Sequence, residues 1–132
     1  MMSIFNTNSA EILLLLFFII TYFLSVFEKI ADWKNTIDYY TNHFENTILH
    51  KMIPLLIIQI LIFEIAALIL LGIGLYFLVS ENSISIAKIG LEISALTLLQ
   101  FLVGQRIAKD YPGAMNITVY FILNIIGIYL LT

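Results

Sequence analysis

Glu64 has the strongest case for chemistry in this chain because of where it lies. It falls inside Met52–Val79, the longest apolar stretch of the sequence. A stretch of that length predicts a membrane-spanning helix, since about 20 mainly apolar residues cross the hydrocarbon core. A carboxylate at such depth costs several kcal/mol unless it is protonated, paired or hydrated. Glu64 is therefore a candidate proton-exchanging group and a candidate hydrogen-bond partner for a small quinone-like ligand.

Other polar residues are expected near the same depth as Glu64. At a rise of about 1.5 Å per residue, Asn124 lies level with Glu64, and Tyr22 and Gln100 lie about 10 Å inside their own segments. Lipid would leave such side chains unpaired, so we expect Tyr22, Gln100 and Asn124 to meet Glu64 inside a bundle. The alternative is structural: a protonated Glu64 hydrogen-bonded to one of these three side chains would fix the register of the helices.

Glu92 is the second candidate for a proton-exchanging group. We favour a pairing with Lys88, which lies one helical turn earlier. If its helix presents Glu92 to the interior, the carboxyl group could instead form a coupled proton site with Glu64.

Three residues at the predicted membrane boundary form a further candidate binding region: Glu28, Gln105 and Arg106. Arg106 could snorkel to phosphate headgroups, turn inward to pair with Glu28 or Glu64, or clamp an anionic ligand. Metal binding is not expected, because His43 and His50 are seven residues apart, too far to chelate one ion as an i, i+4 pair does. The chain has no cysteine, which excludes thiolate metal sites, iron–sulfur clusters and thiol redox chemistry of its own.

The composition indicates what kind of fold must position these residues. The chain has 132 residues, of which 61% are hydrophobic and 11% charged, whereas soluble domains have about 45–50% apolar and about 25% charged residues. Four segments are long enough to span a bilayer: residues 10–29, 52–79, 84–109 and 113–131. The sequence therefore predicts a single all-α membrane domain over residues 1–132, a bundle of four transmembrane helices. Gly72 and Gly74 suggest a close helix contact on the second span.

An additional amphipathic helix is predicted between the first and second spans, over residues 33–50. Its apolar stripe has the helical spacings 4, 3, 4 and 4: Trp33, Ile37, Tyr40, Phe44 and Ile48. This pattern favours a helix lying in the membrane interface, with aromatic rings at headgroup level. The alternative is an ordinary loop helix packed on a neighbour.

The distribution of Lys and Arg predicts the orientation. One end of the predicted bundle carries five of them, whereas the other end carries only Lys88: the five are Lys29, Lys34, Lys51, Arg106 and Lys109. The positive-inside rule then places the first and third loops in the cytoplasm and both termini outside. We interpret the first span as a retained helix, because no basic residue precedes it and no small-residue cleavage site follows it. The net charge of −3, without a basic run, argues against nucleic-acid binding.

The sequence resembles the DoxX family of small four-helix membrane proteins over about residues 10–131. The resemblance rests on Phe-Glu-Lys-Ile at 27–30, Phe-Glu-Ile-Ala-Ala at 63–67 and Gly-Gln-Arg-Ile-Ala-Lys-Asp-Tyr-Pro-Gly at 104–113. The family takes its name from a subunit of a terminal quinol oxidase and thiosulfate:quinone oxidoreductase. The resemblance implies a bacterial inner-membrane location and a quinone or redox setting. It also implies that Glu28, Glu64, Gln105 and Arg106 are the candidate functional positions. The absence of cysteine separates this chain from the thiol-linked roles of the family.

Two functions are open on this basis. The first is a non-catalytic accessory subunit of a larger membrane complex, respiratory or quinone-linked, whose partners are the lipid bilayer and other membrane subunits or further copies of the chain. In that case the chain is not an enzyme on its own and carries no cofactor, apart from a quinone held with its partners. The alternative is a small redox or proton-handling enzyme that uses Glu64 and a bound quinone. A transporter is less favoured, because no pair of broken helices is visible.

Overall fold

The computed structural model describes residues 2–132, with side chains from Asn8 onward, and within these residues every regular element is helical. In chain order the elements are α1 (Met2–Ala31), α2 (Trp33–His43), η1 (His50–Met52), α3 (Ile53–Glu81), α4 (Ser85–Ile107) and α5 (Tyr111–Leu130). Four stretches are long and apolar enough to cross a membrane: Asn8–Ala31, His50–Glu81, Ser85–Ile107 and Tyr111–Leu130. The predicted all-α bundle of four spans is confirmed.

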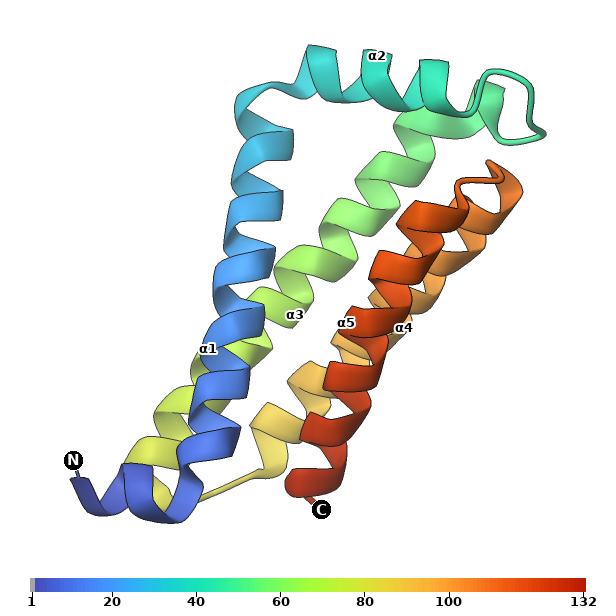
Figure 1. The fold of residues 1–132 in the computed structure, drawn as a ribbon. Coiled ribbons are helices and arrows are strands. Elements are labelled where there is room, and N and C mark those ends of the chain that lie inside the picture. The colour runs from blue at the N-terminus through green and yellow to red at the C-terminus, as the bar shows by residue number, and fades with distance from the viewer. Residues whose placement is uncertain (1) are drawn as a thin grey trace.

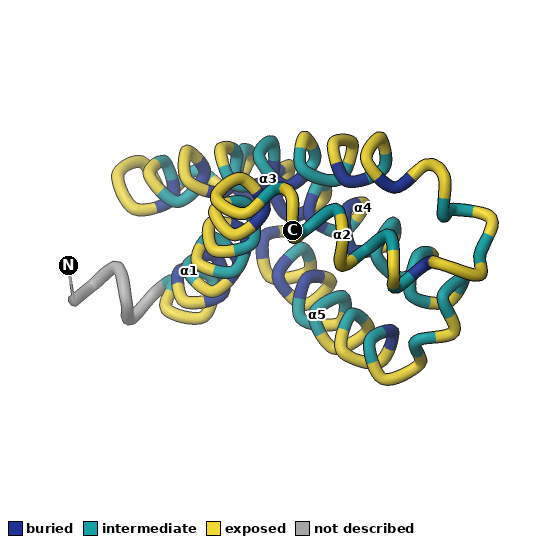
Figure 2. Tube along the Cα trace, turned by 90° about the horizontal axis from the view of Figure 1, so that it is seen from above, coloured by how far each residue is buried: buried dark blue, intermediate teal, exposed yellow. Residues whose placement is uncertain are grey.

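The four long helices lie alongside one another, and α2 runs across one end of them (Figure 1). The turn between α4 and α5 lies at this same end, whereas both termini lie at the opposite end. Exposed residues line the outer sides of the helices, and buried residues face the interior (Figure 2). Most of the large exposed side chains are apolar, for example Phe23, Ile62 and Val119, as expected of surfaces that face lipid.

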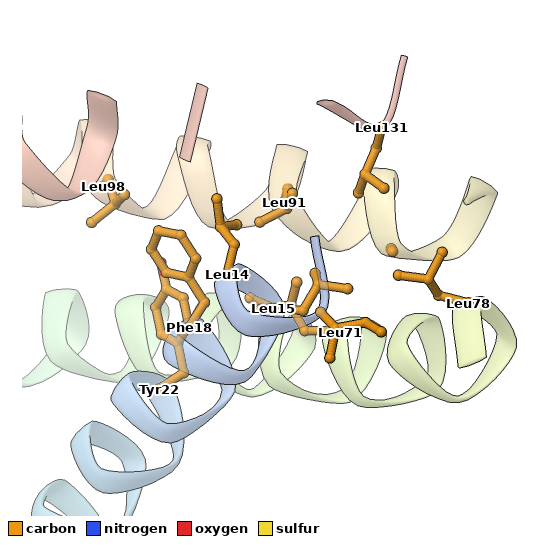
Figure 3. Close-up of a cluster of buried hydrophobic side chains, with 12 residues drawn as sticks. Leu14, Leu15, Phe18, Tyr22, Leu71, Leu78, Leu91, Leu98 and Leu131 are labelled. Carbon is orange, nitrogen blue, oxygen red and sulfur yellow. The ribbon is translucent and has the colours of Figure 1, made fainter. Parts of the chain in front are cut away.

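The core is built from one stripe on each long helix. Leu15, Phe18 and Tyr22 project from α1 at helical spacing and meet Leu71 of α3 and Leu91 of α4 (Figure 3). All five side chains are buried. Each position lies three or four residues from the next on its own helix, so a single face of α1 enters the bundle.

The closest approach between helices lies between α3 and α4. A Cβ atom placed on Gly74 would overlap the backbone of Ala87, and one on Gly90 would lie 3.0 Å from the backbone nitrogen of Leu71. Glycine at both positions lets the two backbones pack directly, as in many membrane helix pairs. Gly72, the other glycine predicted to mark this contact, faces open space instead.

The amphipathic helix is shorter than predicted. It ends at His43 rather than near residue 50, and residues 44–49 form turns before η1. The Thr47 hydroxyl donates to the Phe44 carbonyl and accepts from the Leu49 backbone N–H, and such local side-chain bonds compete with helix formation. Phe44 turns inward onto α3, whereas Ile48, predicted on the same stripe, is 84% exposed.

Candidate functional site

An ion pair between Lys29 and Glu64 lies at the centre of the candidate site. The Lys29 Nζ is 2.9 Å from the Glu64 Oε1, and the two residues are 7% and 1% exposed. Lys29 belongs to the last turn of α1, where side chains tilt toward the N-terminal end of their helix. Its ammonium therefore reaches back into the bundle and donates a hydrogen bond to the Ser25 hydroxyl at 2.6 Å.

The pair is close in space but only partly satisfied. The Lys29 Nζ lies close to the Glu64 Oε1, but no donor among the described residues, this ammonium included, meets the angular requirements of a hydrogen bond to that oxygen. The ammonium also lies 5.8 Å from the centre of the Phe101 ring, which adds a favourable cation–π contact. A buried carboxylate with a free acceptor lobe can accept a further donor, from water or from a ligand.

The pair lines a cavity of about 220 Å³ rather than a solid core. Its polar wall is formed by Thr21, Tyr22, Ser25, Lys29, Tyr40, Glu64, Gln105 and Tyr120. Apolar side chains of α1, α4 and α5 complete it: Phe18, Leu98, Phe101 and Ile117. All five α-helices, α2 included, thus contribute to one chamber around a buried pair of charges.

Two larger hollows adjoin this cavity. An apolar groove of about 500 Å³ runs between α3 and α4 beneath α2, and it shares Tyr40, Phe101 and Gln105 with the cavity. A hollow of about 490 Å³ at the elbow between α1 and α2 shares Lys29 and Tyr40 with it. Tyr40 therefore borders all three spaces, and Lys29 lies between the elbow and the cavity.

Tyr22 and Asn124 meet each other through Ser94, and neither is bonded to Glu64. The Tyr22 and Ser94 hydroxyl oxygens are 2.6 Å apart, and the Asn124 Nδ2 donates to the same Ser94 oxygen at 2.6 Å. The prediction that Glu64 bonds to Tyr22, Asn124 or Gln100 is wrong, because Lys29 supplies its partner. Ser94 is a polar hub that joins α1, α4 and α5.

The remaining predicted site residues are divided between walls and surfaces. Gln100 lines the apolar groove but not the cavity, and Gln105 lines both. Glu28 is exposed and lines the elbow hollow. Arg106 is exposed and lies over the Tyr111 ring, 5.4 Å from its centre. The predicted Glu28–Arg106 pair is not among the ion pairs of the described residues.

Glu92 faces outward from α4 and is exposed. A coupled proton site with Glu64 is therefore wrong, since Glu64 is buried inside the bundle. The predicted Lys88–Glu92 ion pair is also absent from those found in residues 8–132.

Contacts of α2 hold the wall that the cavity shares with the groove. The His43 Nε2 lies 3.0 Å from the Gln105 Oε1 and 3.5 Å from the Asp110 Oδ2. Asp110 in turn caps α5 by accepting the Gly113 backbone N–H at 3.0 Å. Burial raises the pKa of the Tyr40 phenol above its usual value, and the negative charge of Glu64 adds to that effect. Tyr40 is thus held as a neutral hydrogen-bond donor beside the cavity.

Sequence reasoning missed Lys29, Ser25 and Ser94 as site residues. Lys29 lies near the first loop like an ordinary loop cation, although it continues the core stripe of α1 through Phe18, Tyr22 and Ser25 at spacings of 4, 3 and 4. That continuation was the available signal. No cluster of three or more His, Asp or Glu side chains within the described residues could hold a metal ion. Comparisons with family models, with curated proteins and with solved structures find no match.

Proposed function

We propose that this chain is a DoxX-like integral membrane protein that binds a small quinone-like molecule at the Lys29–Glu64 pair. The observation that supports this most directly is that a buried ion pair lines a cavity instead of being packed on all sides. A pair kept only for stability gains nothing from adjacent empty volume, because buried ions need surrounding hydrogen bonds to offset their desolvation.

The dimensions and donors suit an amphipathic ligand with a ring-sized head. Sites for drug-sized ligands occupy about 300–1,000 Å³, so the cavity of about 220 Å³ takes a head group only. The apolar groove of about 500 Å³ has room for an apolar tail beside it. Lys29, Tyr40 and the Gln105 amide can donate hydrogen bonds to a carbonyl oxygen in the cavity.

A bound quinone would supply two-electron, two-proton redox chemistry at this position. The chain's own part is to orient the head group and to hold a proton at the Lys29 Nζ, next to the Glu64 carboxylate. The elbow hollow gives Lys29 a route to the water at the α2 end of the bundle, past the exposed Glu28. We place this end in the cytoplasm of a bacterial inner membrane. Even without the buried Lys29, the α2 end carries Lys34, Lys51, Arg106 and Lys109, against Lys88 at the other.

A second candidate function is a non-catalytic accessory subunit of a larger, quinone-linked membrane complex. The observation in its favour is that Glu64 already has a partner, so the pair can serve as a clamp between α1 and α3. In this case the cavity holds lipid or water, and the chain contributes surface rather than a site.

Quinone titration of the purified protein separates the two functions. The single tryptophan, Trp33, packs on the cluster of Phe44 and Ile53 at the end of the groove, and its fluorescence reports binding there. With decylubiquinone as the probe, we expect saturable quenching that Glu64→Gln and Lys29→Met weaken by about 10- to 100-fold, the loss of one charge-assisted hydrogen bond.

Glu92→Gln is the matched control, because it removes an outward-facing carboxylate from the same bundle and should leave the quenching curve unchanged. If the wild-type chain shows no saturable quenching but is recovered with a stoichiometric partner after mild extraction, the accessory function replaces the first proposal. If the wild-type chain is recovered without a partner and its fluorescence shows no saturable quenching, both proposed functions are contradicted.

A further inference from the structure

The outer face of α4 carries a carboxyl group where a lipid-facing helix should have none. Seven positions alternate at spacings of 4 and 3 along this face: Ser85, Ile89, Glu92, Leu96, Leu99, Val103 and Arg106. All seven are exposed. A repeat averaging 3.5 residues is the spacing of a coiled-coil seam, which one partner helix can cover along its whole length.

Glu92 is too deep in the span to reach water easily. It lies seven residues past the start of α4 at Ser85, which corresponds to about 10 Å along the helix axis. A lysine can snorkel over such a distance, whereas the shorter Glu side chain cannot. Facing lipid, its carboxyl group would cost several kcal/mol, and ionisable groups within spans almost always face protein or a water-filled cavity.

Nothing in the described part of the chain relieves this cost. The nearest cation on the same face is Lys88, one turn earlier, and no ion pair joins the two. Asn116 of α5 is also polar and exposed, but it is uncharged and lies only five residues past the start of its helix. Glu92 is therefore the outward-facing group that most requires a cover.

We propose that a second copy of this chain covers the outer face of α4, with the two Glu92 side chains meeting at the two-fold axis. Two copies inserted in one membrane have the same orientation, so their Glu92 side chains lie at the same depth. A carboxyl group that retains its proton both donates and accepts, so two of them can bond to each other across the axis. Lysine or arginine at this position could not pair with its own copy. Symmetric interfaces of this kind are the commonest form of oligomer.

The apolar positions on either side fit the same contact. Ile89 and Leu96 flank Glu92 one turn away in each direction, and both are about half exposed in the single chain. Burying them with Glu92 would exclude lipid from the carboxyl pair, and a polar group at one seam position would fix the register of the two helices. Leu96, Leu99 and Val103 of this seam also line the apolar groove, whereas Glu92 lines neither the groove nor the cavity, so the two proposals share a wall but not their charged groups.

Disulfide trapping tests the contact directly, because the chain has no cysteine of its own. Leu96→Cys places one thiol on the seam, and Val119→Cys places one on the outer face of α5, where the residue is 61% exposed. In membranes treated with a mild oxidant, we expect a covalent dimer from Leu96→Cys and little from Val119→Cys. Equal trapping at both positions, or none at the seam, would overturn the proposal.

The role of the carboxyl group is tested separately by energy transfer between labelled copies diluted in liposomes. Glu92→Gln keeps a donor and an acceptor and should remain dimeric, whereas Glu92→Leu should raise the dissociation constant by about 5- to 30-fold, corresponding to the loss of one interhelical hydrogen bond of about 1–2 kcal/mol. Unchanged association of Glu92→Leu, or isolation of the chain as a one-to-one complex with a different protein on α4, would overturn it. Lys29→Met should lose quinone quenching but remain dimeric, because Lys29 is not on the seam, so failure of the dimer and failure of the quinone site give different results.

Discussion

Lys29 on α1 reaches Glu64 on α3 across the interior of the bundle, with 2.9 Å between the Nζ and Oε1 atoms. The two residues are 35 positions apart in the chain, and each supplies the charge that the other needs in a nearly water-free setting. This pair connects the stability of the bundle to its candidate chemistry, because the same two groups hold α1 to α3 and line the cavity.

Removing one partner of this pair should destabilise the protein more than removing both. Lys29→Met or Glu64→Leu leaves an unpaired buried charge, which costs about 3–5 kcal/mol, whereas exchange of a whole pair for apolar residues is often close to neutral. Unfolding in detergent is monitored by the loss of the helical circular dichroism signal. It gives the free energies of unfolding of the four proteins in this double-mutant cycle. Single variants within about 1 kcal/mol of the wild type would show that the two charges do not depend on each other.

Ser94→Ala should weaken the contact among α1, α4 and α5. The substitution removes the shared partner of the Tyr22 hydroxyl and the Asn124 amide. Tyr22 keeps its 3.3 Å hydrogen bond to the Ser94 backbone carbonyl, whereas the Asn124 Nδ2 loses this partner, and a buried unsatisfied group costs about 1–3 kcal/mol. Ser80→Ala is the control, because that hydroxyl bonds only within its own helix and is exposed. Equal melting temperatures for Ser94→Ala and the control would contradict the assignment of Ser94 as a hub.

The glycines of α3 provide a matched pair of substitutions. Gly74→Ala should separate α3 from α4 and destabilise the fold, because the new Cβ would overlap the backbone of Ala87. That backbone can shift only if the surrounding part of α4 shifts with it. Gly72→Ala has open space and should be neutral or stabilise α3 by up to about 1 kcal/mol through helix propensity. The comparison requires only thermal unfolding of the two variants in the same detergent. The reverse order of stability would mean that the α3–α4 contact lies elsewhere.

Tyr40 should ionise at a higher pH than an ordinary tyrosine. Its pKa is raised in the folded protein by burial and, secondarily, by the negative charge of Glu64, whereas the unfolded chain should titrate near the ordinary value of about 10. The stability that depends on the neutral phenol is therefore complete below about pH 10 and is lost as the pH rises through the folded-state pKa. The difference in ultraviolet absorbance between the wild type and Tyr40→Phe isolates this titration. An ordinary midpoint in the folded protein would argue against a buried phenol beside the cavity.

The fold was predictable because it depends on quantities that the sequence displays directly. Four long apolar runs separated by polar breaks specify four spans, whatever their packing. The end of α2 was not predictable from the apolar stripe, because Thr47 offers the backbone hydrogen bonds that replace the next helical turn.

The site was only partly predictable, because depth along a span does not give direction around it. Glu64 was identified from its depth alone, but its partner was not, since a lysine near a helix end is ordinarily a loop cation. Glu92 has a comparable depth and faces the opposite way. The direction of Glu92 is indicated by the opposite side of α4, where the buried Ala87, Gly90 and Ser94 form a face of small residues suited to packing. A charged residue on the far side of such a face points outward.

Magic-angle-spinning NMR on the chain in liposomes, with ¹⁵N at lysine Nζ and ¹³C at glutamate Cδ, tests the Lys29–Glu64 pair and its ligand together. The Lys29–Glu64 pair predicts a strong dipolar coupling between one lysine and one glutamate that is absent from Lys29→Met. Adding decylubiquinone should shift both resonances of this coupled pair, with no change in the Glu92 resonance. A spectrum without this coupling would show that the ion pair does not form, and a coupled pair whose chemical shifts do not change on adding quinone would show that the pair does not bind it.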